Sequence, residues 1–263
     1  MKWTTTKIRK AKGQQKLACL TAYDYATATL IDGSGVPLVL VGDSLAMTML
    51  GYPTTLPVTM EDMLHHTLAV SRGVKEALIV GDMPFLSYQI SIEQGIANAG
   101  RFVKEAGADA VKVEGGAFRT PLVKCLIQNG IPVLGHIGLT PQSVKEMGGF
   151  RVQGREPASV AKLLSDAAAL EAAGCFAIVL ECLPEAIGRQ ITDAIGIPTI
   201  GCGAGRHCDG QVLVTHDMLG LHSAITPRFA KRYADIGTTM KEAFVSYKAE
   251  VEAGSFPSDE HAY

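Results

Sequence analysis

Five ionisable side chains lie at the ends of short apolar runs, where chemistry in a folded sheet would be concentrated. Each comes directly after a run rich in valine, isoleucine or leucine, or within one residue of it: Asp43, Asp82, Glu114, His136 and Glu181. If the runs are parallel strands, their carboxyl ends meet at one end of the sheet or barrel. Any one of the acids could be a loop cap or a helix N-terminal charge. Four acids brought together repel one another, so we expect a positive group among them.

The spacing of the acids separates them into two groups. Asp43, Asp82 and Glu114 follow three successive runs, and three carboxylates without a histidine or cysteine cluster suit a hard divalent cation, Mg²⁺ above all. Glu181 follows a later run, so it can approach a bound ligand from another side and act as a general base. A 2-oxo acid could chelate the metal, which would stabilise the enolate formed when the base removes a proton. The pattern predicts enolate chemistry without naming the second reactant.

The sequence allows two interpretations for each of two further polar residues. Lys112 stands two residues before Glu114, on the same face of a strand. It could form a structural ion pair, but we favour substrate binding, because a lysine inside a barrel is costly without an anionic partner. His136 could belong to the site or be a hydrogen-bonded core residue. The glycine-rich Ile200–Gly205 lacks the G-x-G-x-x-G spacing and indicates close backbone approach rather than a nucleotide site.

The elements that must position these residues alternate regularly along the chain. Helix-like stretches such as Ser91–Gly107 and Glu156–Gly174, each ending on a glycine, separate most of the apolar runs. This alternation indicates a parallel sheet covered on both faces, and eight repeats in 263 residues predict a closed (β/α)₈ barrel. The expected strands are Leu17–Thr21, Leu38–Gly42, Ala77–Gly81, Ala110–Val113, Pro132–Gly135, Phe176–Leu180, Pro198–Gly201 and Gln211–Thr215.

No linker or change of composition divides the chain, so we expect one domain over residues 1–263. The glycine-rich segment Pro141–Glu156 is long enough to arch over the barrel mouth as a lid or an oligomer contact. Thr59 is expected to cap a helix, and the chain after Arg228 to continue as helix before a polar end.

Composition excludes several classes of function. A net charge of −2 and a pI near 6.4 give no basic footprint for nucleic acid. No apolar stretch approaches the roughly 20 residues that a membrane span requires, and the basic N-terminus lacks the apolar run of a secretory signal. The six cysteines are scattered without C-x-x-C or zinc spacing, which favours a reduced, cytoplasmic protein.

The chain resembles the ketopantoate hydroxymethyltransferase family from about residue 4 to its end. Many long segments occur in the family's order, which makes the resemblance specific. They are "LTAYDY" (20–25), "LVGDSL" (40–45), "TTLPVT" (54–59), "DMPFLSY" (82–88), "VKVEGG" (111–116), "GHIGLTPQSV" (135–144), "VQGR" (152–155), "LECLP" (180–184) and "GAG…DGQVLV" (203–214).

The resemblance implies a (β/α)₈ barrel of the phosphoenolpyruvate/pyruvate type, a homodecamer and the use of Mg²⁺. It implies transfer of a hydroxymethyl group from 5,10-methylenetetrahydrofolate to 3-methyl-2-oxobutanoate, giving 2-dehydropantoate for pantothenate biosynthesis. Asp43, Asp82 and Glu114 would then surround the metal. Asp43, Ser44, Asp82 and Lys112 would contact the keto acid, and Glu181 would accept the proton.

Three small residues depart from the family's usual pattern: Ala46 for glycine, Gly81 for alanine, and Cys202 within "IGCGAG". They bear on packing and substrate tolerance rather than on the reaction. One alternative is a Mg²⁺-dependent aldolase or lyase of the same barrel type, which would turn over pyruvate with an aldehyde and without folate. A non-enzymatic oligomeric scaffold would be expected to have lost some of the acids, and here all are present.

Overall fold

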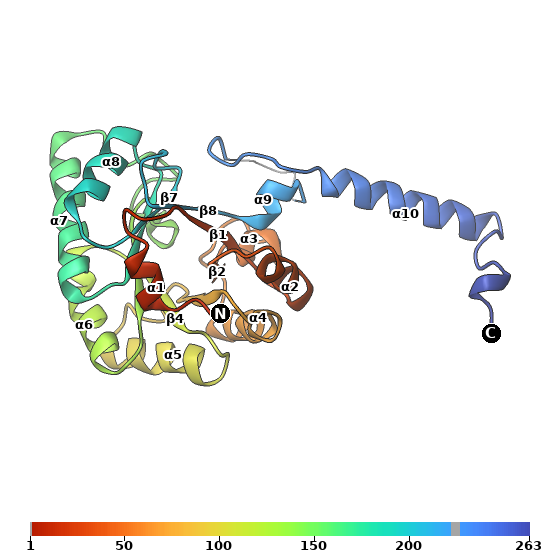
Figure 1. Ribbon diagram of the computed structural model, residues 1–263, viewed down its shortest axis with the longest axis horizontal. Helices are drawn as coiled ribbons and strands as arrows, with labels where there is room; N and C mark the ends of the chain where they lie inside the picture. Colours follow the sequence, from red (N-terminus) through yellow and green to blue (C-terminus); the bar gives the residue numbers. More distant parts are fainter. Residues whose placement is uncertain (1, 222–226) are drawn as a thin grey trace. The chain divides into compact units, whose positions relative to one another are not determined.

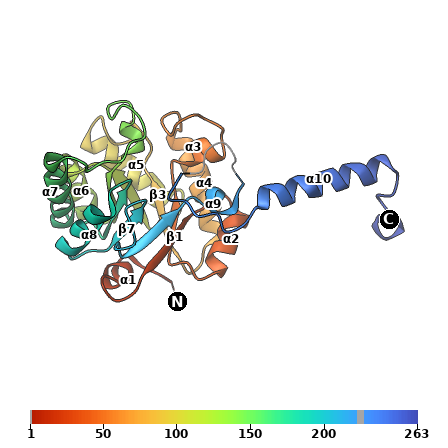
Figure 2. The same ribbon diagram turned by 90° about the horizontal axis from the view of Figure 1, so that it is seen from above.

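The computed structural model describes residues 2–221 and 227–263 and contains a closed barrel of eight parallel strands (Figures 1 and 2). The strands pair in chain order, and β8 closes the ring against β1. Their bounds are β1 Leu17–Thr21, β2 Leu38–Val41, β3 Leu78–Asp82, β4 Ala110–Glu114, β5 Val133–Gly138, β6 Ala177–Glu181, β7 Thr199–Cys202 and β8 Gly210–Leu213. The predicted (β/α)₈ barrel and all eight predicted strands are confirmed.

Continuous apolar sequence is found where both faces of a strand are covered. Every residue of β2, β3, β4 and β5 is buried, as expected for strands with side chains of the barrel interior on one face and helices on the other. The outer face of β1 and β8 differs, because Ala18 and Gln211 are exposed there. The charged Asp82, Lys112 and Glu114 are therefore buried by their position in the strands.

Helices surround the strands in Figure 2, and several begin and end at the expected residues. Thr59 caps α4 in a capping box with Asp62, and Gly174 ends α7 in the left-handed region, with φ +103°. The helices before residue 200 are α1 Thr5–Lys10, α2 Tyr25–Gly33, α3 Leu45–Thr48, α4 Met60–Gly73, α5 Ile92–Lys104, α6 Thr120–Gln128, α7 Pro157–Ala173 and α8 Glu185–Ala194. Short 3₁₀ turns occur at Ala117–Arg119 and Pro141–Ser143. The fully described link 203–209 between β7 and β8 contains no helix.

Strand register fixes which polar residues are neighbours at the carboxyl ends. Asp82 is paired with Lys112 across β3 and β4, and Glu114 with His136 across β4 and β5. Glu181 is paired with Gly138 of β5 on one side and Cys202 of β7 on the other. Residues opposite each other in neighbouring strands point to the same face. The register therefore brings these side chains, which are far apart in the sequence, into one cluster.

One departure from the family pattern has a packing reason. A Cβ atom on Gly81 would lie 2.4 Å from Cδ1 of Phe102, whose side chain from α5 is fully buried. An alanine at this position would therefore require Phe102 to move. Ala46 is also fully buried.

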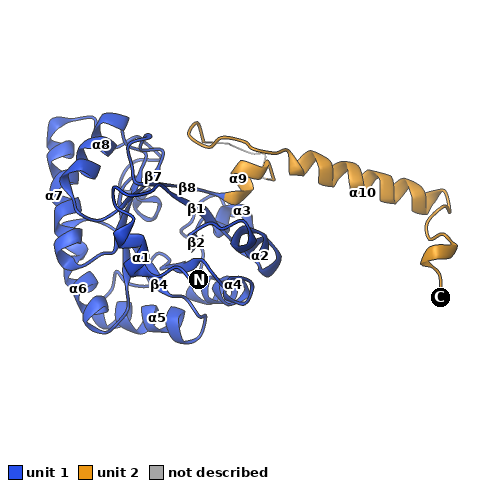
Figure 3. Ribbon diagram, viewed as in Figure 1, with its two compact units in different colours: residues 1–214 blue, residues 215–263 orange. Residues whose placement is uncertain are grey.

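The chain divides into two compact units, coloured separately in Figure 3. Residues Met1–Val214 contain the whole barrel, and Thr215–Tyr263 form the second unit. In the second unit lie α9 Thr215–Leu219, α10 Ile236–Glu252 and a 3₁₀ turn at Asp259–His261, so the predicted helix after Arg228 is confirmed. The expectation of one domain over 1–263 stays a prediction.

Candidate active site

The three acids that follow β2, β3 and β4 lie together and buried at the barrel mouth. Asp43, Asp82 and Glu114 are each at most 4% exposed. The backbone N–H of Asp43 donates to Oδ2 of Asp82 at 3.0 Å, which joins the ends of β2 and β3. The predicted convergence is present in the structure.

The positive group among the acids is Lys112. Its Nζ lies 2.7 Å from Oδ1 of Asp82 and 3.6 Å from Oε1 of Glu114, and its side chain is 5% exposed. Burial would lower the pKa of Lys112, but the charges of Asp82, Glu114 and Asp43 outweigh burial and raise it. Lys112 is therefore cationic, and it forms ion pairs in this structure.

His136 connects this cluster to Glu181. Its Nδ1 lies 3.4 Å from Oε1 of Glu114 and 3.3 Å from Nζ of Lys112, and its Nε2 lies 3.2 Å from Oε2 of Glu181. Burial and Lys112 would lower the pKa of His136, but the two carboxylates raise it to about 9. Of the two interpretations of His136, the geometry places it in the site, as a cation between two acids.

The acids themselves are crowded. Burial, then the charges of Asp82 and Glu114, raise the pKa of Asp43 well above its ordinary value. Burial also raises the pKa of Asp82, although Lys112 opposes it. For Glu114, burial is outweighed by Lys112 and His136, which hold its pKa below the ordinary range. The charged form of Glu114 is therefore favoured, whereas the charged forms of Asp43 and Asp82 are disfavoured.

Two uncharged residues, which the pattern of charges in the sequence did not predict, complete the cluster. Gln142 donates from Nε2 to Oδ2 of Asp43 at 3.1 Å and from its backbone N–H to Oε2 of Glu114 at 3.1 Å. The hydroxyl of Tyr88 donates to Oε1 of Gln142 at 2.6 Å. Both residues lie in loops, within motifs that carry the family resemblance, and that membership was the signal available in the sequence.

Ser44 follows Asp43 in the chain, and Cys202 is paired with Glu181 in the strand register. The Ser44 hydroxyl is 2.8 Å from the hydroxyl of Tyr23, and Ser44 is partly exposed, as a substrate contact would need to be. Cys202 ends β7 beside Glu181 in the register, so the residue that departs from the family pattern lies next to the expected base.

The donor chemistry of the cluster fits a hard divalent cation. Asp82 Oδ1 and Glu114 Oε1 are buried and, among the described residues, lack an aligned hydrogen bond, although Lys112 lies near both. Within those residues no three histidine, cysteine, aspartate or glutamate side chains form a ready metal-binding group, and Lys112 contacts both Asp82 and Glu114. Mg²⁺ commonly takes one or two carboxylates and completes its shell with water and substrate oxygens, which suits this arrangement.

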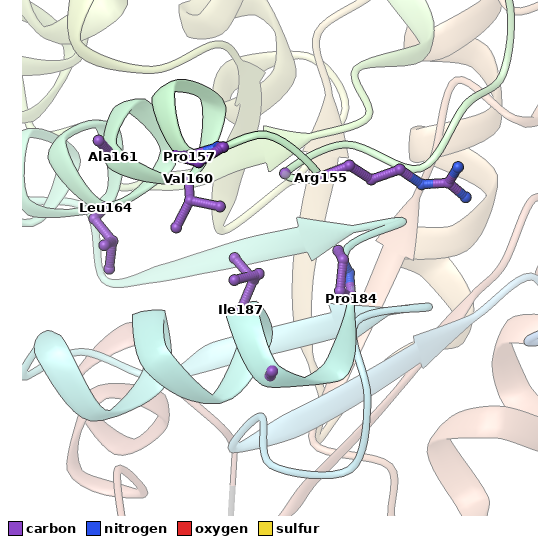
Figure 4. A pocket seen from close by; sticks show the side chains of 9 residues that line it. Arg155, Pro157, Val160, Ala161, Leu164, Pro184 and Ile187 are labelled. Carbon is purple, nitrogen blue, oxygen red and sulfur yellow. The ribbon is translucent and has the colours of Figure 1, made fainter.

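A surface pocket of ≈ 590 Å³ lies apart from these acids, between α7 and α8. Figure 4 shows Val160, Leu164 and Ile187 lining it, with Arg155 extending away from these three side chains. No lining residue is an acid, so the pocket offers no cation site. No helix in the described parts of the chain combines the length and apolar character that a membrane crossing needs.

Comparison with known proteins identifies the family. The family model described as ketopantoate hydroxymethyltransferase matches residues 2–259. The chain belongs to this family. It is 56% identical over 264 residues to the 3-methyl-2-oxobutanoate hydroxymethyltransferase of Clostridium novyi (strain NT), covering 100% of this chain and 96% of the relative. It is 54% identical over 260 residues to that of Nitratidesulfovibrio vulgaris (strain DP4), covering 99% and 85%.

Solved structures with the same fold are more distant in sequence. Phosphonopyruvate hydrolase, crystallised with oxalate and Mg²⁺, superposes with a TM-score of 0.64 at 11% identity, covering 98% of this chain and 93% of that one. A 2,3-dimethylmalate lyase, described as a PEP mutase/isocitrate lyase superfamily member, gives 0.61 at 14% identity, covering 100% and 92%. At this identity the likeness shows the fold alone. The predicted barrel type and hydroxymethyltransferase class are confirmed, and the aldolase or lyase alternative is not favoured.

Proposed function

We propose that this chain transfers a hydroxymethyl group from 5,10-methylenetetrahydrofolate to 3-methyl-2-oxobutanoate, as its family membership implies. C3 of the keto acid loses a proton and forms a carbon–carbon bond to the methylene carbon. Water supplies the hydroxyl group, so that 2-dehydropantoate and tetrahydrofolate leave. One observation carries the assignment of this chemistry to the site, an unbroken series of contacts across the barrel mouth: Asp43, Asp82, Lys112, Glu114, His136 and Glu181.

Asp43, Asp82 and Glu114 would hold a Mg²⁺ ion at the ends of β2, β3 and β4. In support, the site contains four carboxyl groups (Asp43, Asp82, Glu114 and Glu181) but only two basic side chains, Lys112 and His136. Burial, and after it the neighbouring acids, raise the pKa values of Asp43 and Asp82. When bound, the metal would supply Lewis-acid stabilisation of negative charge on the keto oxygen.

Lys112 would bind the carboxylate of the keto acid, with Asp43, Ser44 and Asp82 beside it. Lys112 keeps its charge, because its raised pKa prevents deprotonation near neutral pH. In this role Lys112 would exchange an ion pair within the protein for one with the substrate. Its Nζ lies closer to Asp82 than to Glu114, so the contact with Glu114 is the weaker of the two.

Glu181 would remove the C3 proton. It ends β6, away from the three proposed metal ligands, and its side chain is 17% exposed, whereas that of Glu114 is 4% exposed. A base must be accessible to the substrate, which favours Glu181 over Glu114. His136 Nε2 lies 3.2 Å from Oε2 of Glu181, without an aligned hydrogen bond among the described residues, and connects the base to the rest of the site.

The function is tested with purified protein and both substrates, with and without Mg²⁺. We expect 2-dehydropantoate only when keto acid, methylenetetrahydrofolate and Mg²⁺ are all present. Without folate, the protein and Mg²⁺ should still exchange the C3 proton of 3-methyl-2-oxobutanoate into D₂O. Product formed from pyruvate and an aldehyde without folate would contradict the proposal. Chelation by EDTA with no loss of exchange would contradict the role of the metal.

We further propose a cytoplasmic homo-oligomer, a decamer by resemblance to the family. All six cysteines are free, which suits a reducing compartment. Helix α10 has no buried residue, yet it carries an apolar stripe at helical spacing. The stripe consists of Ile236, Met240, Phe244, Tyr247 and Val251, which are between 36% and 63% exposed. A second copy of the chain is the partner we assign to this stripe.

Light scattering after gel filtration tests the oligomer. Phe244→Glu places a charge in the stripe and should shift the protein to smaller assemblies. Ala249→Glu places the same charge on the opposite side of α10 and should leave the mass unchanged. Equal masses for Phe244→Glu and the parent protein would show that the stripe does not take part in oligomer assembly.

A further inference from the structure

One side-chain amide joins acids that belong to different strands. Gln142 lies in the 3₁₀ turn Pro141–Ser143 after β5 and is 5% exposed. Its Nε2 donates to Asp43 Oδ2 at 3.1 Å and to the carbonyl oxygen of Met83 at 2.9 Å. Its Oε1 accepts from the hydroxyl of Tyr88 at 2.6 Å and from Nε2 of Gln89 at 3.1 Å.

These four contacts use the full capacity of a primary amide, which has two N–H donors and two lone pairs on oxygen. The orientation of the amide is fixed as well, because the carbonyl of Met83 can only accept. Turned over, the amide would place its oxygen against both the Met83 carbonyl and the Asp43 carboxylate. Gln142 therefore presents an N–H to Asp43 in a single orientation.

The same residue also holds an acid on another strand. The backbone N–H of Gln142 donates to Glu114 Oε2 at 3.1 Å, and the hydroxyl of Tyr88 accepts from the backbone N–H of Glu114 at 3.2 Å. A residue after β5 thus connects Asp43 after β2 with Glu114 at the end of β4. Both pairs are buried, where hydrogen bonds are screened least.

We propose that Gln142 is a positioning residue for the divalent cation, holding Asp43 and Glu114 at a fixed separation, with Tyr88 orienting its amide. The proposal rests on the metal role of Asp43 and Glu114 given under the proposed function. Outer partners that orient metal ligands are typically worth about 10- to 100-fold in metal affinity or activity. Gln142 touches neither substrate nor metal in this account and acts through the two acids.

Gln142→Met tests the proposal, because methionine keeps the length of the side chain and removes both the donor and the acceptor. We expect the dissociation constant for Mg²⁺, measured by titration calorimetry on the folded variant, to rise about 10- to 100-fold. The electron paramagnetic resonance spectrum of bound Mn²⁺ should broaden relative to the parent protein. At saturating Mg²⁺, most of kcat should return. Gln94→Met on α5 is the matched control and should leave Mg²⁺ binding unchanged.

Tyr88→Phe provides a second measurement that keeps the buried ring and removes only the hydroxyl. It should weaken Mg²⁺ binding in the same direction by roughly tenfold or less, because the Gln142 amide loses one of four contacts. If Gln142→Met does not fold, the Mg²⁺ affinity of Tyr88→Phe tests the proposal instead. Parent-like Mg²⁺ affinity in the folded variants, with only a lower Tm, would overturn the positioning role. A parent protein without saturable Mg²⁺ binding would overturn the metal role as well, which is a different result.

Discussion

Aspartates occupy both ends of the barrel, and their partners differ. At the amino ends of the strands they accept hydrogen bonds from backbone N–H groups: Asp32 from residues 75–77 before β3, Asp109 from Ile79 of β3, and Asp209 from Thr199 of β7. At the carboxyl ends, Asp43 and Asp82 face other acids, Lys112 and Gln142. The first group accepts hydrogen bonds from backbone N–H groups, with Lys2 and Lys12 also paired to Asp109 and Asp209. The second group is surrounded mainly by side chains.

This difference has an energetic meaning. Backbone N–H groups favour the charged form, so the pKa of Asp32 is lowered despite the opposing effect of burial. Burial, together with the neighbouring acids, raises the pKa of Asp43 and Asp82, which means that folding disfavours their charge. The charge of Asp32 should therefore contribute stability, whereas the charges of Asp43 and Asp82 reduce it and are available to a cation.

The largest effect is expected when an acid of the mouth is removed. Asp43→Asn should lower kcat by about a thousandfold, since a Lewis-acid contribution of about 4 kcal/mol corresponds to that factor. Its metal-free Tm should stay level or rise, because a crowded charge is lost. Steady-state kinetics with varied Mg²⁺ and calorimetry in EDTA measure both quantities. A large fall in Tm would show that Asp43 stabilises the fold, as the aspartates at the amino ends are expected to do.

Removing the proposed base should have an effect of similar size. Glu181→Gln keeps shape and should lower kcat by about 10²- to 10⁴-fold, the usual contribution of a general base. Mg²⁺ and keto-acid binding should persist, because Glu181 is not among the proposed metal ligands. Proton exchange at C3 in D₂O, with Mg²⁺ and without folate, separates the roles. Exchange at the parent rate would show that Glu181 is not the base.

Strand positions and strand-end acids were predictable because each is a local pattern. Short apolar runs identify the strands, and at four of them an acid stands at the end of the run or directly after it: Asp43, Asp82, Glu114 and Glu181. The period of two placed Lys112 and Glu114 on one face. The shorter contact of Lys112, to Asp82 at 2.7 Å, depends on the register between β3 and β4, which no local pattern contains.

Loop residues show the same limit more strongly. Gln142 and Tyr88 carry no charge and lie 54 residues apart, yet they hydrogen-bond in the site. The pairing of β3 with β4 and of β4 with β5 brings the two loops together. His136 was recognisable as a strand residue, but its position between Glu114 and Glu181 follows from pairing of β5 with both neighbouring strands.

Removing an acid at the amino ends should have the opposite outcome to Asp43→Asn. Asp209 is 6% exposed, and its Oδ2 contacts Nζ of Lys12 and the backbone N–H of Thr199, both at 2.9 Å. Asp209→Ala leaves these donors without their acceptor and should cost about 2–4 kcal/mol in unfolding free energy. Urea unfolding measures the loss, and kcat of the folded fraction should be unchanged. A fall in kcat without loss of stability would contradict the view that the aspartates at the amino ends stabilise the fold while the acids at the carboxyl ends serve the reaction.

The smallest effect, and the most specific one, concerns Asp32 and pH. Its carboxylate accepts backbone N–H groups of Lys75, Glu76 and Ala77 at 2.8–3.0 Å, and these lower its pKa. A lowered folded-state pKa adds stability that is present above the unfolded value, about 3.9, and is lost as pH falls through the folded value. Asp32→Asn should thus cost about 1 kcal/mol at pH 7, with the difference narrowing as the pH is lowered below about 4. Asp193→Asn, at an acid whose side chain is 70% exposed on α8, is the matched control and should show no such trend. Urea unfolding of the parent protein and both variants between pH 3 and 7 measures the differences in unfolding free energy. If the difference between the parent and Asp32→Asn does not change with pH, the charged hydrogen bonds of Asp32 are not its cause.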